Sequence, residues 1–351
     1  MRTKRLEGPL LRALMVSLIA SAMSTLPLGT ASADGLTPRA PILIEGNSGF
    51  TAANGIVAGS GTAGNPYVIE GWVIDASGAN GITIRNTTAH FVVRSCHVRG
   101  GGELYDGIYL ENVRNGRIEG VRSENNRAGI NIRYSSNVVI KNTVATNNLF
   151  GIYLSNSTGN AVENCIASNN FWQGIYLDNS SSNVVSSSKI QRNLIGINCN
   201  ENSENNLIRH NNFVNNEIQA HDEGSNRWDD GYPSGGNYWS DYVGVDGDRD
   251  GIGDEPYRIA GDNNLDRYPL MNPFEPPVQT PSEGRKWKWP PMEAVAWAAT
   301  AIGALVAFYM GRVARLRQAR LEEAKRRRRR EGPERARKRR KGRRSPRKRP
   351  R

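Results

Sequence analysis

The sequence predicts an all-β fold, a right-handed parallel β-helix solenoid with coils of about 22 residues. Three observations predict it: a repeated Gly-Ile-x-Leu-like motif, apolar residues that alternate with period two, and no helical periodicity between the motifs. The motifs begin at residues 81, 107, 129, 151, 174 and 196, at intervals of 26, 22, 22, 23 and 22 residues. A unit repeated at this spacing buries its apolar face by stacking on its neighbours.

Each motif reads as a strand with one buried face. In the third repeat Ile130 and Ile132 point one way while Asn131 points the other, which is the two-residue period of a strand. A second short apolar strand follows, as at 138–140 (VVI). No helix-length segment separates the strands, so βαβ units and leucine-rich horseshoes are disfavoured.

An Asn-rich turn precedes the motifs. These turns contain Asn125–Asn126, Asn147–Asn148, Asn169–Asn170, Asn193 and Asn215–Asn216. Amides stacked at the same place in successive coils can form hydrogen-bonded ladders, and Asn tolerates the left-handed backbone of tight turns. We therefore interpret these residues as structural rather than catalytic.

Solenoid ends need covering segments. Residues 34–80 are expected to form an N-terminal cap and the first coils, residues 81–220 the β-helix repeats, and residues 221–274 a C-terminal cap.

The flanking segments predict export and membrane anchoring. Residues 1–33 resemble a signal peptide, with a basic start, an apolar stretch and the small-residue cleavage site Ala31-Ser-Ala33; an uncleaved anchor is the alternative. A Pro-rich stalk is expected at 275–290 and a transmembrane helix at 291–311. Residues 312–351 carry 22 Lys and Arg against 4 acidic residues, which favours a basic cytoplasmic tail.

This topology places the β-helix outside the cell membrane on a single-pass anchor. The tail is expected to attract anionic lipid headgroups, with nucleic acid as a less favoured partner. Small residues at every fourth position of the membrane helix, from Ala299 to Gly311, allow self-association, although composition alone also explains them.

An acidic loop in the predicted C-terminal cap is a candidate Ca²⁺ site. Its ligands would be the carboxylates of Asp246, Asp248, Asp250 and Asp254 and the carbonyl of Ile252. Tyr257 stands where an EF-hand loop has a bidentate Glu. The role would be structural, and a solvated acidic turn is the alternative.

The outward side of the repeated strand is a candidate ligand-binding surface. Its predicted ligand-binding residues are Tyr109, Glu111, Asn131, Arg133, Tyr153, Tyr176 and Asp178. A flat aromatic and polar stripe suits glycans, whereas tyrosines that simply pack on each other are the alternative. Glu111 and Asp178 would lie three coils apart, about 14 Å, which exceeds the spacing of a glycosidase pair. No catalytic residue is assigned.

The remaining motifs are less specific. The three cysteines, Cys96, Cys165 and Cys199, are expected to be buried without a disulfide. The four histidines are scattered, and His97 beside Cys96 is a weak copper candidate, so copper binding is disfavoured. Asn86, Asn156 and Asn179 begin glycosylation sequons, all five residues after a motif glycine and hence on one edge.

The Asn-rich coils, followed by GNYWSDY at 236–242, DGDRDGIGDEPY at 246–257 and DRYPL at 266–270, resemble the NosD-like β-helix family. The resemblance covers roughly residues 40–275. It implies a parallel β-helix, which is common in exported archaeal proteins and shared with carbohydrate-binding and sugar-hydrolysing proteins. In denitrifying bacteria the family implies copper delivery to nitrous oxide reductase.

The favoured hypothesis is therefore a membrane-anchored extracellular β-helix that binds glycans, envelope polymers or another exported protein without catalysis. One alternative is a carbohydrate-active hydrolase or lyase. The other is a copper-maturation accessory for nitrous oxide reductase.

Overall fold

The computed structural model describes residues 35–275. The predicted signal peptide, the stalk beyond residue 275, the membrane helix and the basic tail lie outside these residues. Within residues 35–275, no helix has the length and apolar character needed to cross a membrane.

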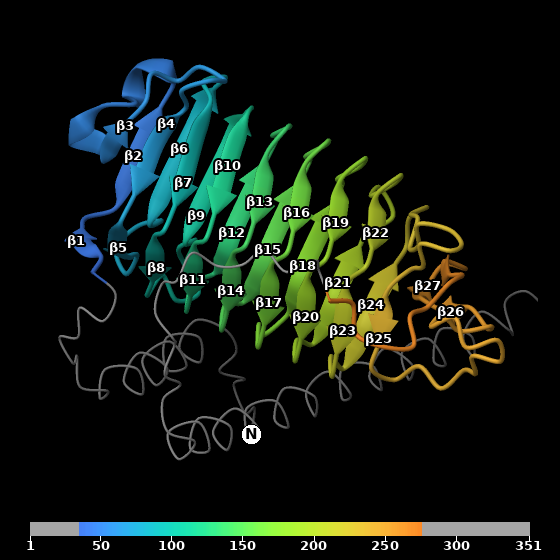
Figure 1. Cartoon of the computed structure of the whole chain (residues 1–351). Helices are drawn as coiled ribbons and strands as arrows, with labels where there is room; N and C mark the ends of the chain where they lie inside the picture. The colour runs from blue at the N-terminus through green and yellow to red at the C-terminus, as the bar shows by residue number, and fades with distance from the viewer. Residues whose placement is uncertain (1–34, 276–351) are drawn as a thin grey trace, which may run out of the picture. The chain divides into compact units, whose positions relative to one another are not determined.

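The described residues form a parallel β-helix of about 8 turns, with about 23 residues per turn, which confirms the predicted parallel solenoid (Figure 1). Three parallel sheets, A, B and C, run along its length, and every full coil contributes one strand to each. One coil, for example, consists of β12 (Ala128–Arg133) in sheet B, β13 (Val139–Lys141) in sheet C and β14 (Val144–Thr146) in sheet A.

Within each sheet the strands lie side by side in the order of the coils. Sheet B contains β2 (Ile42–Glu45), β6 (Ile82–Thr87), β9 (Ile108–Val113), β12, β15 (Phe150–Ser155), β18 (Gln173–Asp178), β21 (Ile195–Cys199), β24 (Ile218–Asp222) and β27 (Ala260–Gly261). Sheet C contains β3 (Ile56–Ala58), β4 (Tyr67–Glu70), β7 (Phe91–Arg94), β10 (Gly116–Glu119), β13, β16 (Ala161–Glu163), β19 (Val184–Ser186) and β22 (Leu207–Arg209). Sheet A contains β1 (Thr37–Arg39), β5 (Trp72–Asp75), β8 (His97–Arg99), β11 (Arg122–Glu124), β14, β17 (Ile166–Ser168), β20 (Lys189–Gln191), β23 (Asn212–Val214) and β25 (Tyr238–Trp239).

The ends depart from this pattern. Near the N-terminus, β3 pairs antiparallel with β4 after two short 3₁₀ turns, η1 (Asn47–Gly49) and η2 (Ala52–Asn54). Near the C-terminus, β26 (Tyr257–Arg258) and β28 (Leu265–Asp266) form an antiparallel pair.

The sequence pattern identified two strands in each coil, and sheet A supplies a third that it did not reveal. Each regular sheet A strand has three residues and turns only the middle one inward, as with Ala145 in β14 and Ala167 in β17. One inward residue gives no alternation along the sequence, so the pattern could not reveal this strand.

The predicted interior columns are present. Ile130, Ile152 and Ile175 are register partners in sheet B and have no exposed surface. The motif glycines permit this close stacking. At Gly151 an added Cβ would lie 2.3 Å from the carbonyl oxygen of Gly174, which is closer than atoms can approach. Cys96, Cys165 and Cys199 are buried and free, as expected.

The predicted amide ladder is also present. Asn148 Nδ2 donates to Asn170 Oδ1 at 3.2 Å, and Asn170 Nδ2 donates to Asn193 Oδ1 at 3.0 Å. The residue before each buried Asn adopts the left-handed conformation, as at Asn147 (φ 56°) and Asn169 (φ 54°). A second ladder, which was not predicted, lies at the turn between sheets B and C and is formed by Asn160, Asn183, Asn206 and Asn226.

Candidate functional site

The outer face of sheet B aligns the predicted ligand-binding residues in two columns. Tyr109, Asn131, Tyr153 and Tyr176 are successive register partners in one column. Glu111, Arg133, Ser155 and Asp178 form the second column, two residues further along each strand. The face therefore presents side chains from four consecutive coils along the rod axis.

A buried carboxylate organises the N-terminal part of this face. Asp106 Oδ2 accepts hydrogen bonds from Arg127 Nη2 at 2.6 Å and Asn131 Nδ2 at 2.9 Å, while its Oδ1 accepts one from the Ala128 amide. Asn131 lies in the expected column but has no exposed surface. Asn131 therefore has its predicted place in the outward column, but its amide packs into the Asp106 network and is covered.

Stacked aromatic rings form the C-terminal part of the face. The Tyr153 and Tyr176 ring centroids lie 5.0 Å apart with planes 8° from parallel, and Phe150 stacks on Tyr153 at 5.5 Å. Their flat sides face each other, so the side-by-side tyrosine packing considered from the sequence is present. These tyrosines therefore offer a ligand their ring edges and hydroxyls rather than their ring faces.

Asp178 fixes the polar edge of this stack. Its carboxylate accepts hydrogen bonds from Tyr153 Oη at 2.7 Å and Asn200 Nδ2 at 2.6 Å. Burial, together with the hydrogen bond to Asp178, raises the pKa of Tyr153 to about 12. Burial also raises the pKa of Tyr109 and Tyr176 above the ordinary value. These hydroxyls are protonated at neutral pH and suit binding rather than proton abstraction.

Glu111 and Asp178 do not form the carboxylate pair of a glycosidase on this face. The register places Ser155 and Arg133 between Asp178 and Glu111, which separates these two acids by three coils, as predicted. Three strand spacings amount to about 14 Å, beyond the range that glycoside hydrolysis uses.

A bulge that was not predicted lies beside the aromatic stack. Asn148 pairs with Asn170 after 22 residues, whereas the next motif glycine, Gly174, follows Gly151 after 23. The extra residue therefore falls between Asn170 and Gly174. The amides of Phe171 and Trp172 still pair with Asn148 and Leu149 of the coil before, so the extra residue follows them. Phe171, next to this irregularity, is 41% exposed and meets Trp172 edge to face at 5.2 Å. The irregular interval was the signal that could have revealed it.

The predicted calcium loop brings three carboxylates together. One oxygen from each of Asp246, Asp248 and Asp250 lies within 4.8 Å of the others. The amide of Ile252 donates to Asp250 Oδ1, and Asp254 Oδ2 accepts the Gly247 amide at 2.9 Å, which closes the loop. A cluster of hard oxygen donors fits Ca²⁺ chemistry, and calcium binding stays a prediction.

The histidines are engaged elsewhere. Within residues 35–275, the acidic, His or Cys side chains that converge in a group of three or more are the three aspartates of the acidic loop. No His or Cys belongs to that group. His97 Nε2 lies 2.9 Å from Glu124 Oε1, whereas Cys96 is a core residue whose pKa burial raises to about 11. Burial raises the pKa of Glu124, but hydrogen bonds from His97 and Arg122 outweigh it and lower that pKa to about 2.

One Ser, His and Asp cluster forms near the C-terminal end but lacks catalytic geometry. Ser234 Oγ lies 3.4 Å from His210 Nε2 and 3.2 Å from Asp230 Oδ2. His210 Nε2 is closer to the Ser234 carbonyl oxygen, at 2.8 Å, and must donate its proton there. This nitrogen therefore cannot accept a proton from the hydroxyl.

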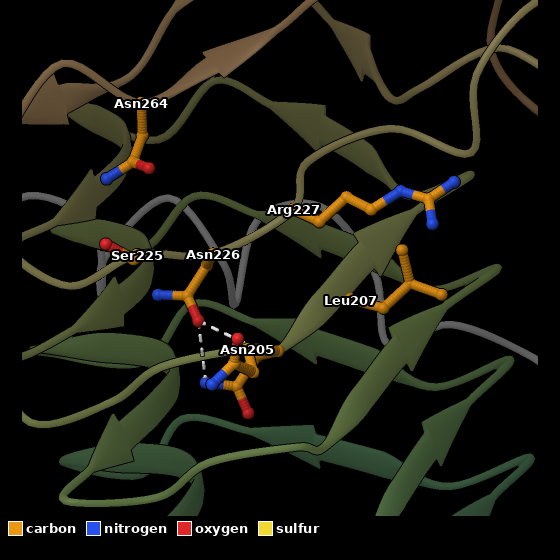
Figure 2. Close-up of a pocket in the computed structure, with 7 residues that line it drawn as sticks. Asn205, Leu207, Ser225, Asn226, Arg227 and Asn264 are labelled. Carbon is orange, nitrogen blue, oxygen red and sulfur yellow. Dashed lines mark hydrogen bonds between the residues drawn. The ribbon is translucent and has the colours of Figure 1, made fainter.

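A shallow groove lies at the turn after β21 and β24 (Figure 2). Its volume is about 460 Å³, and Asn205, Asn206, Leu207, Ser225, Asn226, Arg227 and Asn264 line it. Asn206 and Asn226 are joined by the ladder hydrogen bonds drawn in Figure 2, so their amides are occupied by the fold. An adjoining hollow of about 410 Å³ shares Ser225 and Asn264 and is acidic, with Glu201, Glu204, Glu223 and Asp262 on its walls.

The sequon asparagines share one corner of the helix. Asn86 lies near the end of β6, whereas Asn156 and Asn179 directly follow β15 and β18. All three adopt the left-handed conformation, with φ of 55°, 51° and 50°. Asn179 Nδ2 donates to Asn156 Oδ1, and Asn86 Oδ1 accepts from Asn112 Nδ2 at 2.8 Å. Glycosylation at these positions stays a prediction.

Comparison with known proteins identifies the family. The family model described as periplasmic copper-binding protein (NosD) matches residues 42–244. The chain belongs to the NosD family. The matched segment contains the whole predicted ligand face of this NosD-family chain and ends before the acidic loop.

Two NosD relatives match part of the chain, and both are described as probable ABC transporter binding protein NosD. The protein from Stutzerimonas stutzeri is 34% identical over 87 residues, which is 25% of this chain and 20% of the relative. The protein from Pseudomonas aeruginosa is 38% identical over 79 residues, or 22% of this chain and 18% of the relative. The matches span about a fifth of these relatives' length.

Two solved structures illustrate the wider likeness. The periplasmic alginate epimerase AlgG is 22% identical, with 45% of this chain and 38% of that chain covered and a TM-score of 0.38. Pectate lyase Pel9A is 16% identical, with 58% of this chain and 68% of that chain covered and a TM-score of 0.41. Neither likeness bears on the ligand of the NosD-family chain.

Proposed function

We propose that this NosD-family β-helix binds polysaccharide along the outer face of sheet B and does not cleave it. The observation that carries the proposal is the ordered aromatic and polar surface formed by Phe150, Tyr153, Tyr176 and Asp178. Its side chains are held in place by one another before a ligand arrives, which lowers the entropic cost of binding. The predicted signal and membrane helix would hold this surface outside the cell membrane.

A binding role fits the chemistry of the face better than catalysis. The pKa of Tyr153 is raised, and Asp178 accepts hydrogen bonds from Tyr153, Ser155 and Asn200. The carbohydrate-active alternative needs an acid and a base within reach of one bond, and Glu111 and Asp178 do not supply them.

The copper-maturation alternative has the family description as its support. The converging donors in residues 35–275 are carboxylates, which suit hard cations more than copper. Titrating the protein with Cu(I) and Cu(II) tests this alternative directly. Stoichiometric binding that His97→Ala abolishes would favour it over the polysaccharide proposal.

The test of polysaccharide binding uses the full-length protein in mild detergent on affinity gels that contain a polysaccharide panel. We expect retardation by at least one polymer without release of products. Tyr153→Phe and Asp178→Asn should weaken it several-fold, because each breaks the network at the stack. Ile166→Ala, an exposed apolar site on sheet A, is the matched control. Released oligosaccharides would support the enzyme alternative, and absence of retardation by every polymer would reject binding.

A further inference from the structure

Two amide carbonyls on the sheet B face lack hydrogen-bond donors among residues 35–275. Asn131 Oδ1 and Gln173 Oε1 are buried oxygens with no partner in this described range. The Asn131 amide orientation is set by its Nδ2, which donates to Asp106, so its oxygen cannot be exchanged for the nitrogen without losing that bond. A buried acceptor without a donor costs about 1–3 kcal/mol, so both positions favour a ligand that brings N–H or O–H groups.

Each arginine of this face has a carboxylate as its ion-pair partner or as its register neighbour. Arg127 binds Asp106 at 2.6 Å, and Arg85 binds Glu45 at 3.0 Å. Arg133 is the register partner of Glu111; burial lowers its pKa, but Tyr109 and Glu111 outweigh burial and raise it. None of the ion pairs found within residues 35–275 includes Arg133, but Glu111 on the neighbouring strand offsets its charge.

On the described part of this face, the charges of Arg85, Arg127 and Arg133 are offset by those of Glu45, Asp106 and Glu111, which leaves the negative charge of Asp178. Asp178 receives neutral donors from Tyr153 and Asn200, and none of the ion pairs found within residues 35–275 includes it. A polyanionic chain laid along β12, β15 and β18 would meet this carboxylate unscreened by any cation of that range.

An exposed aromatic ring lies at the edge of the same face. Phe171 is 41% exposed and lies two residues before Gln173, at the start of β18. Tyr153 and Tyr176 stack flat on each other, whereas Phe171 meets Trp172 edge to face. Such a ring can pack against the apolar side of a sugar.

We infer that the sheet B ligand is an uncharged polysaccharide, whose hydroxyls donate to the Gln173 and Asn131 carbonyls and one of whose sugar rings packs on Phe171. This rests on the proposed polysaccharide binding and adds the ligand's chemical class. Gln173 is partly exposed and is the first contact, whereas Asn131 is fully covered and is reached when the side chains above it move.

The test compares laminarin, an uncharged glucan, with alginate and polygalacturonate, using the full-length protein and calorimetry. We expect at least about ten-fold tighter binding of laminarin, with little dependence on salt concentration. Phe171→Ala and Gln173→Met should each weaken laminarin binding about three- to ten-fold. Gln173→Glu, which keeps acceptor oxygens, should bind laminarin more tightly than Gln173→Met.

The melting temperature of Gln173→Met shows whether Gln173 contacts the ligand or only supports the fold. Gln173→Met removes an unpartnered acceptor, so its melting temperature should equal or exceed that of the wild type while its affinity falls. Ile166→Ala should leave affinity unchanged. Equal or tighter binding of alginate, or laminarin binding that survives both substitutions, would overturn the uncharged-ligand inference while leaving polysaccharide binding intact. Failure of every polymer to bind would overturn both.

Discussion

The regular coils and the C-terminal cap solve the same hydrogen-bonding problem with different residues. In the coils, each ladder Asn accepts from the coil before it and donates to the coil after it, as Asn170 does between Asn148 and Asn193. The last coil has no following coil whose oxygens could accept its N–H donors. The ladders there end on carboxylates. The first passes through Gln219 to Asp241, and the second ends on Asp222. A third ladder, which runs from Asn211 through Asn237, ends on Asp266.

Tryptophans complete these endings. Trp228 Nε1 donates to Asp222 at 2.7 Å, and Trp239 Nε1 donates to Asp266 at 2.9 Å. Both rings are buried over the end of the core, and Trp239 stacks on Phe213 at 4.2 Å. An amide therefore suits the middle of a ladder and a carboxylate suits its end, because only the amide has a donor to pass on.

Exchanging the two residue types should have the largest effect. Asn170→Asp keeps the oxygens that Asn148 uses but removes the donors to Asn193 Oδ1 and Ala145 O, and it buries a charge. We expect a loss of about 3 kcal/mol or more in the free energy of unfolding, measured by urea denaturation. The exposed neighbour Asn169→Asp is the control, with a change within about 0.5 kcal/mol. A buried substitution as mild as the exposed one would refute this account of the ladders.

The cap should respond to pH where the coils do not. Burial outweighs the donated hydrogen bonds and raises the pKa of Asp266 to about 6, above its unfolded value of 3.8. The folded state then binds the proton more tightly. The resulting stabilisation is complete below about pH 4 and is lost as the pH rises through about 6, by about 2–3 kcal/mol.

Urea unfolding at pH 5 and pH 7 measures this effect, with Asp266→Asn as the comparison. Asp266→Asn should lose less stability than the wild type between pH 5 and pH 7. Some loss should remain, because the pKa of Asp222 is also raised. The lowered pKa values of Glu124 and Asp229 act only at lower pH. An unchanged slope in Asp266→Asn would mean that Asp266 does not titrate in this range.

Calcium should have the smallest effect on the cap, since its predicted site lies in an exposed loop. At a free Ca²⁺ concentration about ten times the dissociation constant, binding would stabilise the fold by about 1.4 kcal/mol. We expect a higher melting temperature with Ca²⁺ for the wild type but not for Asp248→Ala. Equal responses of the two proteins would leave the loop as a solvated acidic turn.

The coil stacking, the inward Ile and Leu columns and the Asn ladder before each motif could all be predicted from the amino-acid pattern. These features depend on local patterns that recur in every coil, so period and spacing suffice to read them. The strands of sheet A were not predicted, because three-residue strands with one inward side chain show no alternation of apolar and polar residues. The asparagines of the ladder at the turn between sheets B and C also recur in the sequence. They stand as single Asn residues among many, so they gave no separate signal.

The character of the ligand face depends on how the coils meet in the folded molecule. The pattern predicted Asn131, Tyr153 and Tyr176 on one outward column, and the register agrees. Whether such a side chain is free depends on residues brought in by other coils: Asp106 engages Asn131, and the two tyrosines cover each other's flat sides. Burial and pairing across coils are set by stacking distance and side-chain direction, which no single repeat encodes.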